Sequence, residues 1–125
     1  MEVGQSLVQT FTVREQDSAV AMGSGSLQVL ATPAMVAFME NTAMKLVACD
    51  NPEGSTTVGT EINVKHLKAS AIGSKVTVKA TLSLIDGRKR AFYIEAEDEN
   101  GNVIGTAEHQ RFVVDIERFM SKLKG

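Results

Sequence analysis

The chain has 125 residues, which predicts one domain with one core over residues 1–125. Hydrophobic residues make up 43% and charged residues 22%, as in ordinary soluble globular proteins. The net charge of -2 provides no electrostatic surface for nucleic acid or an anionic membrane. No apolar run approaches the roughly 18 residues that span a bilayer, so we expect neither a nucleic-acid nor a membrane partner.

Cysteine usage and the first residues indicate the compartment. The single Cys49 cannot form an intramolecular disulfide, and residues 1–5 lack the basic and apolar regions of a signal peptide. Both observations favour the cytoplasm. No His and Cys residues have metal-ligand spacing, and no glycine-rich phosphate loop follows a strand. We therefore expect any enzyme of this sequence to use side chains alone, without a metal or bound cofactor.

The first predicted elements are a strand and a loop. Residues 6–14 alternate loosely as a strand, with Leu7, Phe11 and Val13 on one face and Gln9 interrupting it. Residues 15–27 are mixed and contain the flexible run Gly23-Ser24-Gly25-Ser26. A loop of this length is either a lid over a site or a plain surface connection.

A long buried helix follows, within Leu30–Ala48. Thr32 followed by Pro33 is typical of a helix start, because a Thr side chain can accept a backbone N–H and Pro fits the first helical position. Nearly every side of the first two turns is apolar, which indicates burial. Glu40 lies in the middle of this helix, and a buried charge without a partner is unfavourable. Glu40 therefore either has a partner or takes part in chemistry.

Four more strands are predicted, at residues 55–67, 75–85, 88–97 and 103–114, before a short helix at 116–123. Asp86-Gly87 and Asn100-Gly101 are hairpin signals between them. Alternation predicts three sets of residues that share a face: Val58, Thr60, Ile62, Val64 and His66; then Val76, Val78, Ala80, Leu82 and Leu84; then Phe92, Ile94 and Ala96.

This order of elements predicts an α+β fold in which an antiparallel sheet of about five strands wraps around one long central helix. The free sheet edge favours edge-to-edge dimerisation. Thr32 and Glu40 are separated by roughly 12 Å along the helix axis, so they do not meet within one chain. Two helices packed antiparallel about a two-fold axis near Val36 would bring Thr32 of one chain to Glu40 of the other. We therefore predict two equal composite sites at a dimer interface.

Four motifs support a family resemblance: Ala31-Thr32-Pro33…Val36…Glu40, Val58-Gly59-Thr60…Val64-Lys65-His66, Asp86-Gly87-Arg88, and Ile104-Gly105…His109-Gln110-Arg111. With them, the chain resembles the hot-dog fold thioesterases similar to fluoroacetyl-CoA thioesterase, from about residue 4 to residue 119. The resemblance implies hydrolysis of a small or medium acyl-CoA thioester by a homodimer, with a tetramer as the larger alternative. It also implies no metal, with coenzyme A present only as part of the substrate.

The resemblance also assigns residues. The family's catalytic set is a Thr at the helix start, a Glu eight residues later and a His on the next strand, which match Thr32, Glu40 and His66. The glycine beside the acyl group matches Gly59, and the arginine of the C-terminal strand matches Arg111. The sequence departs from the family at its Phe-rich lid, because residues 17–23 contain no Phe. Fluoroacetyl specificity is therefore not carried over.

Each catalytic candidate has a chemical and a structural interpretation. The N–H donors at a helix start can stabilise the carbonyl oxygen of a thioester under attack. The Thr32 hydroxyl either orients a water, acts as a nucleophile, or only caps the helix. Glu40 is a general base, a nucleophile that forms a mixed anhydride, or half of a buried ion pair with Lys45 or a partner chain. His66 activates Thr32, delivers a proton to the leaving thiolate, or is a hydrogen-bonded core histidine.

Lys and Arg side chains are expected to contact the phosphates of coenzyme A. The candidates are Lys65, Lys68, Arg88, Arg90 and Arg111. Asn41 is a candidate for a hydrogen bond near Glu40, and His109 is expected to be structural or exposed.

Two other functions remain open. One is a hot-dog dehydratase or hydratase acting on acyl thioesters, and the other is a non-catalytic acyl-CoA-binding module. Only hydrolysis releases free thiol from acyl-CoA, and only the binding module would bind coenzyme A without turnover.

Overall fold

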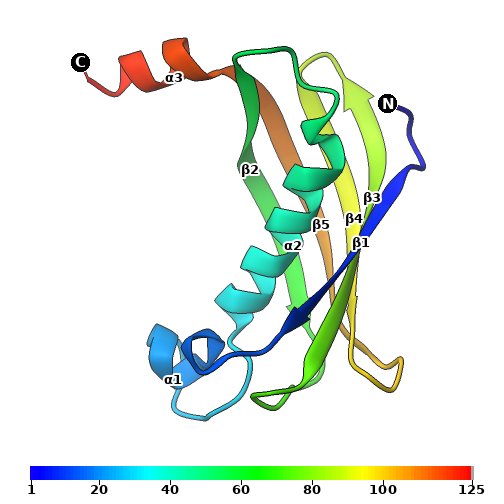
Figure 1. The fold of residues 1–125 in the computed structure, drawn as a ribbon, viewed down its shortest axis with the longest axis vertical. Helices are drawn as coiled ribbons and strands as arrows, with labels where there is room; N and C mark the ends of the chain where they lie inside the picture. The colour runs from blue at the N-terminus through cyan, green and yellow to red at the C-terminus, as the bar shows by residue number, and fades with distance from the viewer. Residues whose placement is uncertain (125) are drawn as a thin grey trace.

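The computed structural model describes residues 1–124. In chain order its elements are β1 (Ser6–Thr12), the 3₁₀ turn η1 (Glu15–Asp17), α1 (Ala19–Met22), α2 (Thr32–Ala48), β2 (Ser55–His66), β3 (Lys75–Asp86), β4 (Lys89–Glu97), β5 (Val103–Asp115) and α3 (Ile116–Lys122). The strands form one five-stranded antiparallel sheet in the order β1-β3-β4-β5-β2, and α2 lies along one face of it (Figure 1). The predicted α+β architecture is confirmed. Within residues 1–124, no helix has the length and apolar character needed to cross a membrane.

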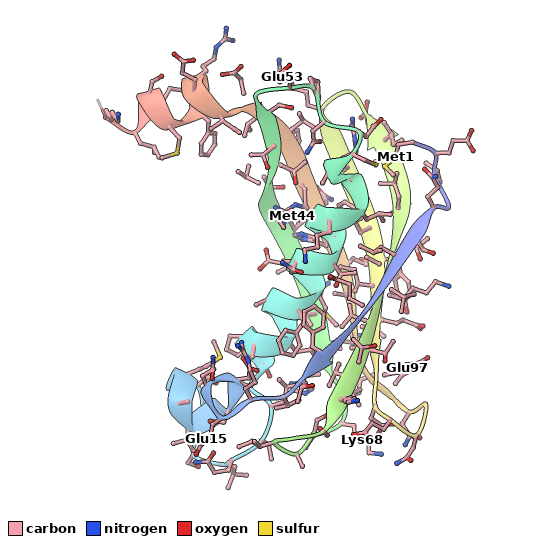
Figure 2. All side chains as sticks on the ribbon, viewed as in Figure 1. Met1, Glu15, Met44, Glu53, Lys68 and Glu97 are labelled. Carbon is pink, nitrogen blue, oxygen red and sulfur yellow. The ribbon has the colours of Figure 1, made fainter. Side chains whose placement is uncertain are left out.

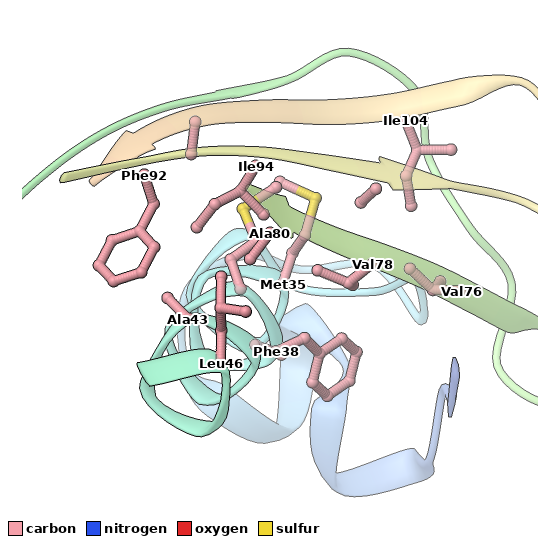
Figure 3. Packing of buried hydrophobic residues seen from close by; sticks show 14 of the residues in the cluster. Met35, Phe38, Ala43, Leu46, Val76, Val78, Ala80, Phe92, Ile94 and Ile104 are labelled. Atoms are coloured by element: carbon pink, nitrogen blue, oxygen red, sulfur yellow. The ribbon is translucent and has the colours of Figure 1, made fainter. Parts of the chain in front are cut away.

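The core lies between α2 and the sheet (Figure 3). Its labelled side chains are Met35, Phe38, Ala43 and Leu46 from α2, and Val76, Val78, Ala80, Phe92, Ile94 and Ile104 from the sheet. Phe38 also stacks on Phe11 of β1, with ring centroids 4.4 Å apart. Because apolar packing secures α2 along its length, the sheet fixes where the polar side chains of this helix lie.

A β-bulge in β2 corrects the predicted faces of that strand. Gly59 pairs with Arg111 and Glu61 pairs with Gln110, so Thr60 is an extra residue in the ladder. An extra residue moves the preceding side chains to the opposite face of the sheet. Thr57 and Gly59 therefore face α2 together with Ile62, Val64 and His66, and the prediction that Val58 and Thr60 share this face is wrong.

A second irregularity lies in β3, between Leu82 and Leu84. Val76, Val78, Ala80 and Leu82 are buried as predicted. Leu84 is 40% exposed, so its predicted place on the same face is wrong, again because one extra residue reverses the alternation.

Gly105 of β5 allows a close approach of the sheet to α2. A Cβ at this position would lie 2.6 Å from both Sδ and Cε of Met35 and 3.2 Å from the Lys65 carbonyl oxygen. Met35 is fully buried and has little room to move.

We expect Gly105→Ala to destabilise the fold by about 1–3 kcal/mol, because it overpacks the core. Adding Met35→Leu to the Gly105→Ala variant should recover part of the lost stability, because it shortens the side chain opposite residue 105. Urea unfolding monitored by circular dichroism measures both, with Thr106→Ala on the other face of β5 as the control. Equal stability of the Gly105→Ala variant and the parent would contradict this packing.

Candidate active site

The first polar group of the site joins the start of α2 to the end of β2. Thr32 Oγ1 and His66 Nδ1 are hydrogen-bonded at 2.8 Å. The N-cap of α2 is Ala31, and no side chain caps the helix. Of the three interpretations of the Thr32 side chain, the helix cap is therefore wrong: Thr32 is the first helical residue, and its hydroxyl contacts the imidazole instead.

Both side chains open onto a cleft of about 340 Å³. It is lined by Ala19, Ser24, Val29, Leu30, Ala31, Thr32, His66, Leu67, Lys68 and Ala69. Thr32 is exposed and His66 is half-buried. The first-turn N–H groups of an α-helix have no intrahelical acceptor and carry its positive dipole end. The cleft thus presents a hydroxyl, an imidazole and a helix N-terminus to any molecule that enters it.

Burial lowers the pKa of His66 below its ordinary value of 6.5, while a backbone interaction with Lys68 opposes the shift. The ring is therefore neutral at pH 7, as proton transfer with a hydroxyl requires. Its Nε2 atom is buried and has no hydrogen-bond partner among residues 1–124. One ring nitrogen thus contacts Thr32, and the other is available.

The segment of residues 15–31, which includes the predicted loop at 15–27, folds into short structured pieces near the start of α2 (Figure 1). It contains η1 and α1, and Gly23 ends α1 in the left-handed conformation with φ of 71°. Ser18 and Leu30 form an isolated bridge, and the Ala19 N–H donates to the Val29 carbonyl at 2.9 Å. This segment supplies one wall of the cleft, and its movement as a lid stays a prediction.

A second polar group lies near the middle of α2. A Cβ on Gly59 of β2 would lie 2.9 Å from Glu40 Oε2, 3.3 Å from Arg111 Nη1 and 3.3 Å from His109 Cε1. Glu40, Arg111 and His109 therefore surround one small space that only glycine leaves open. Three residues predicted from the sequence, Glu40, Gly59 and Arg111, come together here, while Thr32 and His66 lie at the start of the helix.

Arg111 is held inside the protein. Its Nε donates to Thr57 Oγ1 at 2.8 Å and its Nη2 to the Thr57 carbonyl at 2.9 Å, and the side chain is buried. Burial lowers the pKa of Arg111, and Glu40 opposes the shift. Arg111 thus has structural partners in this chain, and contact with substrate remains a prediction for it.

The other predicted binding residues, except Lys68, lie apart from both groups. Asn41 accepts from Gln9 Nε2 of β1 at 3.1 Å, toward the sheet edge opposite β2. Lys65 is exposed on the outer face of β2. Arg88 lines a separate hollow of about 340 Å³ together with Glu53, whereas Lys68 lines the cleft. Figure 2 labels Glu53 and Lys68 at opposite ends of the molecule, so Arg88 and the cleft of the same chain are far apart.

The sequence prediction missed the orientation of Thr57, which was assigned to the outer face because the bulge was not foreseen. His109 is buried and hydrogen-bonded, which agrees with the structural interpretation predicted for it. Gln9 was treated as an interruption, yet its amide also donates to Thr42 Oγ1 at 2.8 Å. Two signals in the sequence could have indicated these contacts. His109 and Arg111 are two residues apart, which places them on the same face of a strand, and Gln9 is a polar residue on an otherwise apolar face. Among residues 1–124, no three His, Cys, Asp or Glu side chains cluster as metal ligands would.

Comparison with known proteins identifies the family. Residues 13–117 match the family described as fluoroacetyl-CoA-specific thioesterase. The chain belongs to this family. The fluoroacetyl-CoA thioesterase of Streptantibioticus cattleyicolor is 34% identical over 97 residues, which cover 78% of this chain and 69% of that protein. The chain is therefore a thioesterase, an enzyme that hydrolyses thioester bonds, and the resemblance inferred from the sequence motifs is confirmed.

Solved structures agree with this assignment. A solved structure of a fluoroacetyl-CoA thioesterase has a TM-score of 0.94 and 29% identity, covering 99% of this chain and 96% of that one. A hot-dog-like protein from Thermanaerovibrio acidaminovorans has a TM-score of 0.88 at 22% identity, covering 97% and 89%. The second match supports the hot-dog fold alone. Membership of a thioesterase family favours hydrolysis over the hydratase and the non-catalytic binding module.

The space beside Gly59 gives a prediction for this family member. In Gly59→Ala, the added Cβ would meet Glu40 Oε2, so the carboxylate must move. We expect thioesterase turnover to fall by about tenfold or more, since misplacing a catalytic group by about 1 Å can lower the rate about a hundredfold. Free-thiol release measures it, with Asn63→Ala on the outer face of β2 as the control. Wild-type turnover in the Gly59→Ala variant would show that the position of Glu40 does not matter.

Proposed function

We propose that this thioesterase hydrolyses a small or medium acyl-CoA thioester, in a site built by two copies of the chain. The observation that carries the proposal is the hydrogen-bonded pair of Thr32 and His66 in a cleft at the N-terminus of α2. The matched relative is named for fluoroacetyl-CoA, and a variant of a fluoroacetyl-CoA-specific thioesterase was solved with fluoroacetate and coenzyme A. Residues 17–23 contain no Phe, so the proposal covers small and medium acyl groups and does not specify the fluoroacetyl group.

Thioester hydrolysis needs an activated oxygen, a place for negative charge and a proton for the leaving thiolate. Neutral His66 can accept a proton from the Thr32 hydroxyl or from a water that this hydroxyl orients. The N–H groups at the start of α2 can stabilise the carbonyl oxygen as it becomes negative. The imidazolium then returns its proton to the sulfur as the C–S bond breaks and coenzyme A leaves. Where Thr32 is the nucleophile, a water activated by His66 afterwards hydrolyses the acyl ester on Thr32.

Glu40 completes the site from the partner chain. β2 is an edge strand of 12 residues that pairs only with β5 in the sheet of residues 1–124. Antiparallel pairing of β2 with its copy about a two-fold axis places the start of one strand beside the end of the other. The same axis relates two antiparallel α2 helices, so Glu40 of one chain approaches Thr32 and His66 of its partner. There it acts either as a nucleophile, forming a mixed anhydride that water then hydrolyses, or as general base on water.

The two-fold axis also explains the location of the basic residues. Arg88 lies by the start of β2, at the end of the sheet opposite the cleft of its own chain. In the dimer it would lie by the partner's cleft, where coenzyme A phosphates can reach it. Lys65 and Lys68 lie near the end of β2, so they are the basic residues contributed by the chain that carries the cleft.

We expect Thr32→Ala, Glu40→Gln and His66→Gln each to lower kcat for acyl-CoA hydrolysis by roughly a hundredfold or more, the size of a lost acid–base or nucleophilic group. A panel of acyl-CoA chain lengths, read by release of free thiol, gives kcat and the preferred acyl group. Lys79→Ala, an exposed change on β3, is the control. Wild-type kcat in all three variants would refute this site.

The composite site predicts complementation between two inactive variants. When Glu40→Gln and His66→Gln chains are mixed and reassembled, half of the dimers are mixed, and each contains one intact site. Activity should therefore recover to about a quarter of the wild-type value. Refolding from urea followed by the thiol assay measures it, with each variant refolded alone as the control. No recovery, despite mixed dimers detected by native mass spectrometry, would place Glu40 and His66 of the same chain in one site.

The pH dependence follows from the state of His66. The reaction uses the neutral ring, and burial lowers the pKa of His66 below 6.5. The group is neutral above its pKa, so kcat/KM should be constant at neutral pH and fall in acid with a midpoint below 6.5. Circular dichroism at each pH confirms that the fold persists. A midpoint above 6.5 would contradict this assignment.

A further inference from the structure

His109 makes two contacts that fix its protonation. It is 1% exposed on β5, and its Nδ1 lies 2.8 Å from the Glu61 carbonyl oxygen beside the bulge of β2. A carbonyl can only accept, so Nδ1 carries the hydrogen and Nε2 is left as an acceptor. Arg111 Nη1 lies 3.2 Å from Nε2 and donates to it. Burial, assisted by the charge of Arg111, lowers the pKa of His109, which keeps the ring neutral.

These contacts determine where the guanidinium of Arg111 points. Thr57 accepts from Nε and from Nη2, and His109 accepts from Nη1. Glu40 Oε2 and Arg111 Nη1 both lie within 3.3 Å of the point that a Cβ on Gly59 would occupy. Even so, the two side chains form no ion pair within residues 1–124. The positive charge is near the carboxylate without binding it.

We propose that His109 is a positioning residue that holds Arg111 Nη1 away from Glu40, so that the carboxylate oxygens remain free for the reaction. An Arg side chain readily forms a two-pronged ion pair with a carboxylate, and such a pair would occupy both oxygens. Without the imidazole acceptor, the buried Nη1 can turn toward Glu40 Oε2, which borders the same space beside Gly59. This inference rests on the proposed role of Glu40 in acyl-CoA hydrolysis.

The test compares His109→Phe with His109→Gln. Phe keeps an aromatic ring against Phe92, whose ring centroid lies 5.8 Å from that of His109, but offers Arg111 no acceptor. We expect it to lower kcat by about tenfold or more, with KM within about twofold, because substrate binding is intact and the reacting carboxylate is not. The Gln side-chain oxygen can accept from Nη1, so His109→Gln should retain most of kcat. Equal kcat in the two variants would overturn the proposal.

Glu108→Gln is the control. It changes the residue beside His109 on the other face of β5 and leaves the hydrogen bonds of His109 and Arg111 in place, so kcat should stay near the wild-type value. A loss as large as that of His109→Phe would assign the effect to a disturbance of β5 in general and overturn the role given to His109. If His109→Phe does not fold, His109→Asn, too short to reach Nη1, is judged by the same criteria.

Glu40→Gln separates the two proposals. If this variant keeps its turnover, the proposed catalytic role of Glu40 fails, and the role of His109 fails with it. If Glu40→Gln is inactive while His109→Phe has wild-type kcat, only the role of His109 fails.

Discussion

The extra residue Thr60 in β2 determines which side chains of this strand face α2. Gly59 and His66 are seven positions apart, an odd number, so in an unbroken strand they would face opposite sides of the sheet. The bulge at Thr60 places both on the side of the helix. Its Glu61 carbonyl also accepts from His109, so the same irregularity helps to secure a buried histidine of β5. Bulges that redirect side chains are common beside active sites, and this one serves both polar groups.

The apolar packing of α2 then sets the spacing between those groups. Thr32 lies with His66 at the start of the helix, and Glu40 lies with Gly59 and Arg111 about two turns further on, roughly 12 Å along the axis. Met35, between them, is fully buried against the sheet, so neither group can slide toward the other without repacking the core. A rigid helix with two separated polar groups is the physical reason for proposing a site shared by two chains.

The fold could be predicted because its signals are local and agree with one another. The turns at Asp86-Gly87 and Asn100-Gly101, strict alternation in β3 and β4, and one long apolar helix all indicate the same sheet-and-helix arrangement. The bulges could not be predicted, since alternation continues through Thr60 in the sequence and only pairing with β5 makes this residue extra. The start of α2 was misassigned by one residue because the tertiary contact with His66 competes with the cap for the Thr32 hydroxyl. Local propensity cannot include a partner that is 34 residues away.

The two histidines show that burial alone does not make a proton-transfer group. Burial lowers the pKa of both His66 and His109, so both rings are neutral. His109 uses both nitrogens, one for the Glu61 carbonyl and one for Arg111, and protonating it would place two N–H donors against each other. His66 contacts a hydroxyl that can itself give or take a proton, and its second nitrogen is unpaired within residues 1–124. Hydrogen-bond partners, rather than pKa, therefore leave His66 free to exchange a proton and confine His109 to a fixed orientation.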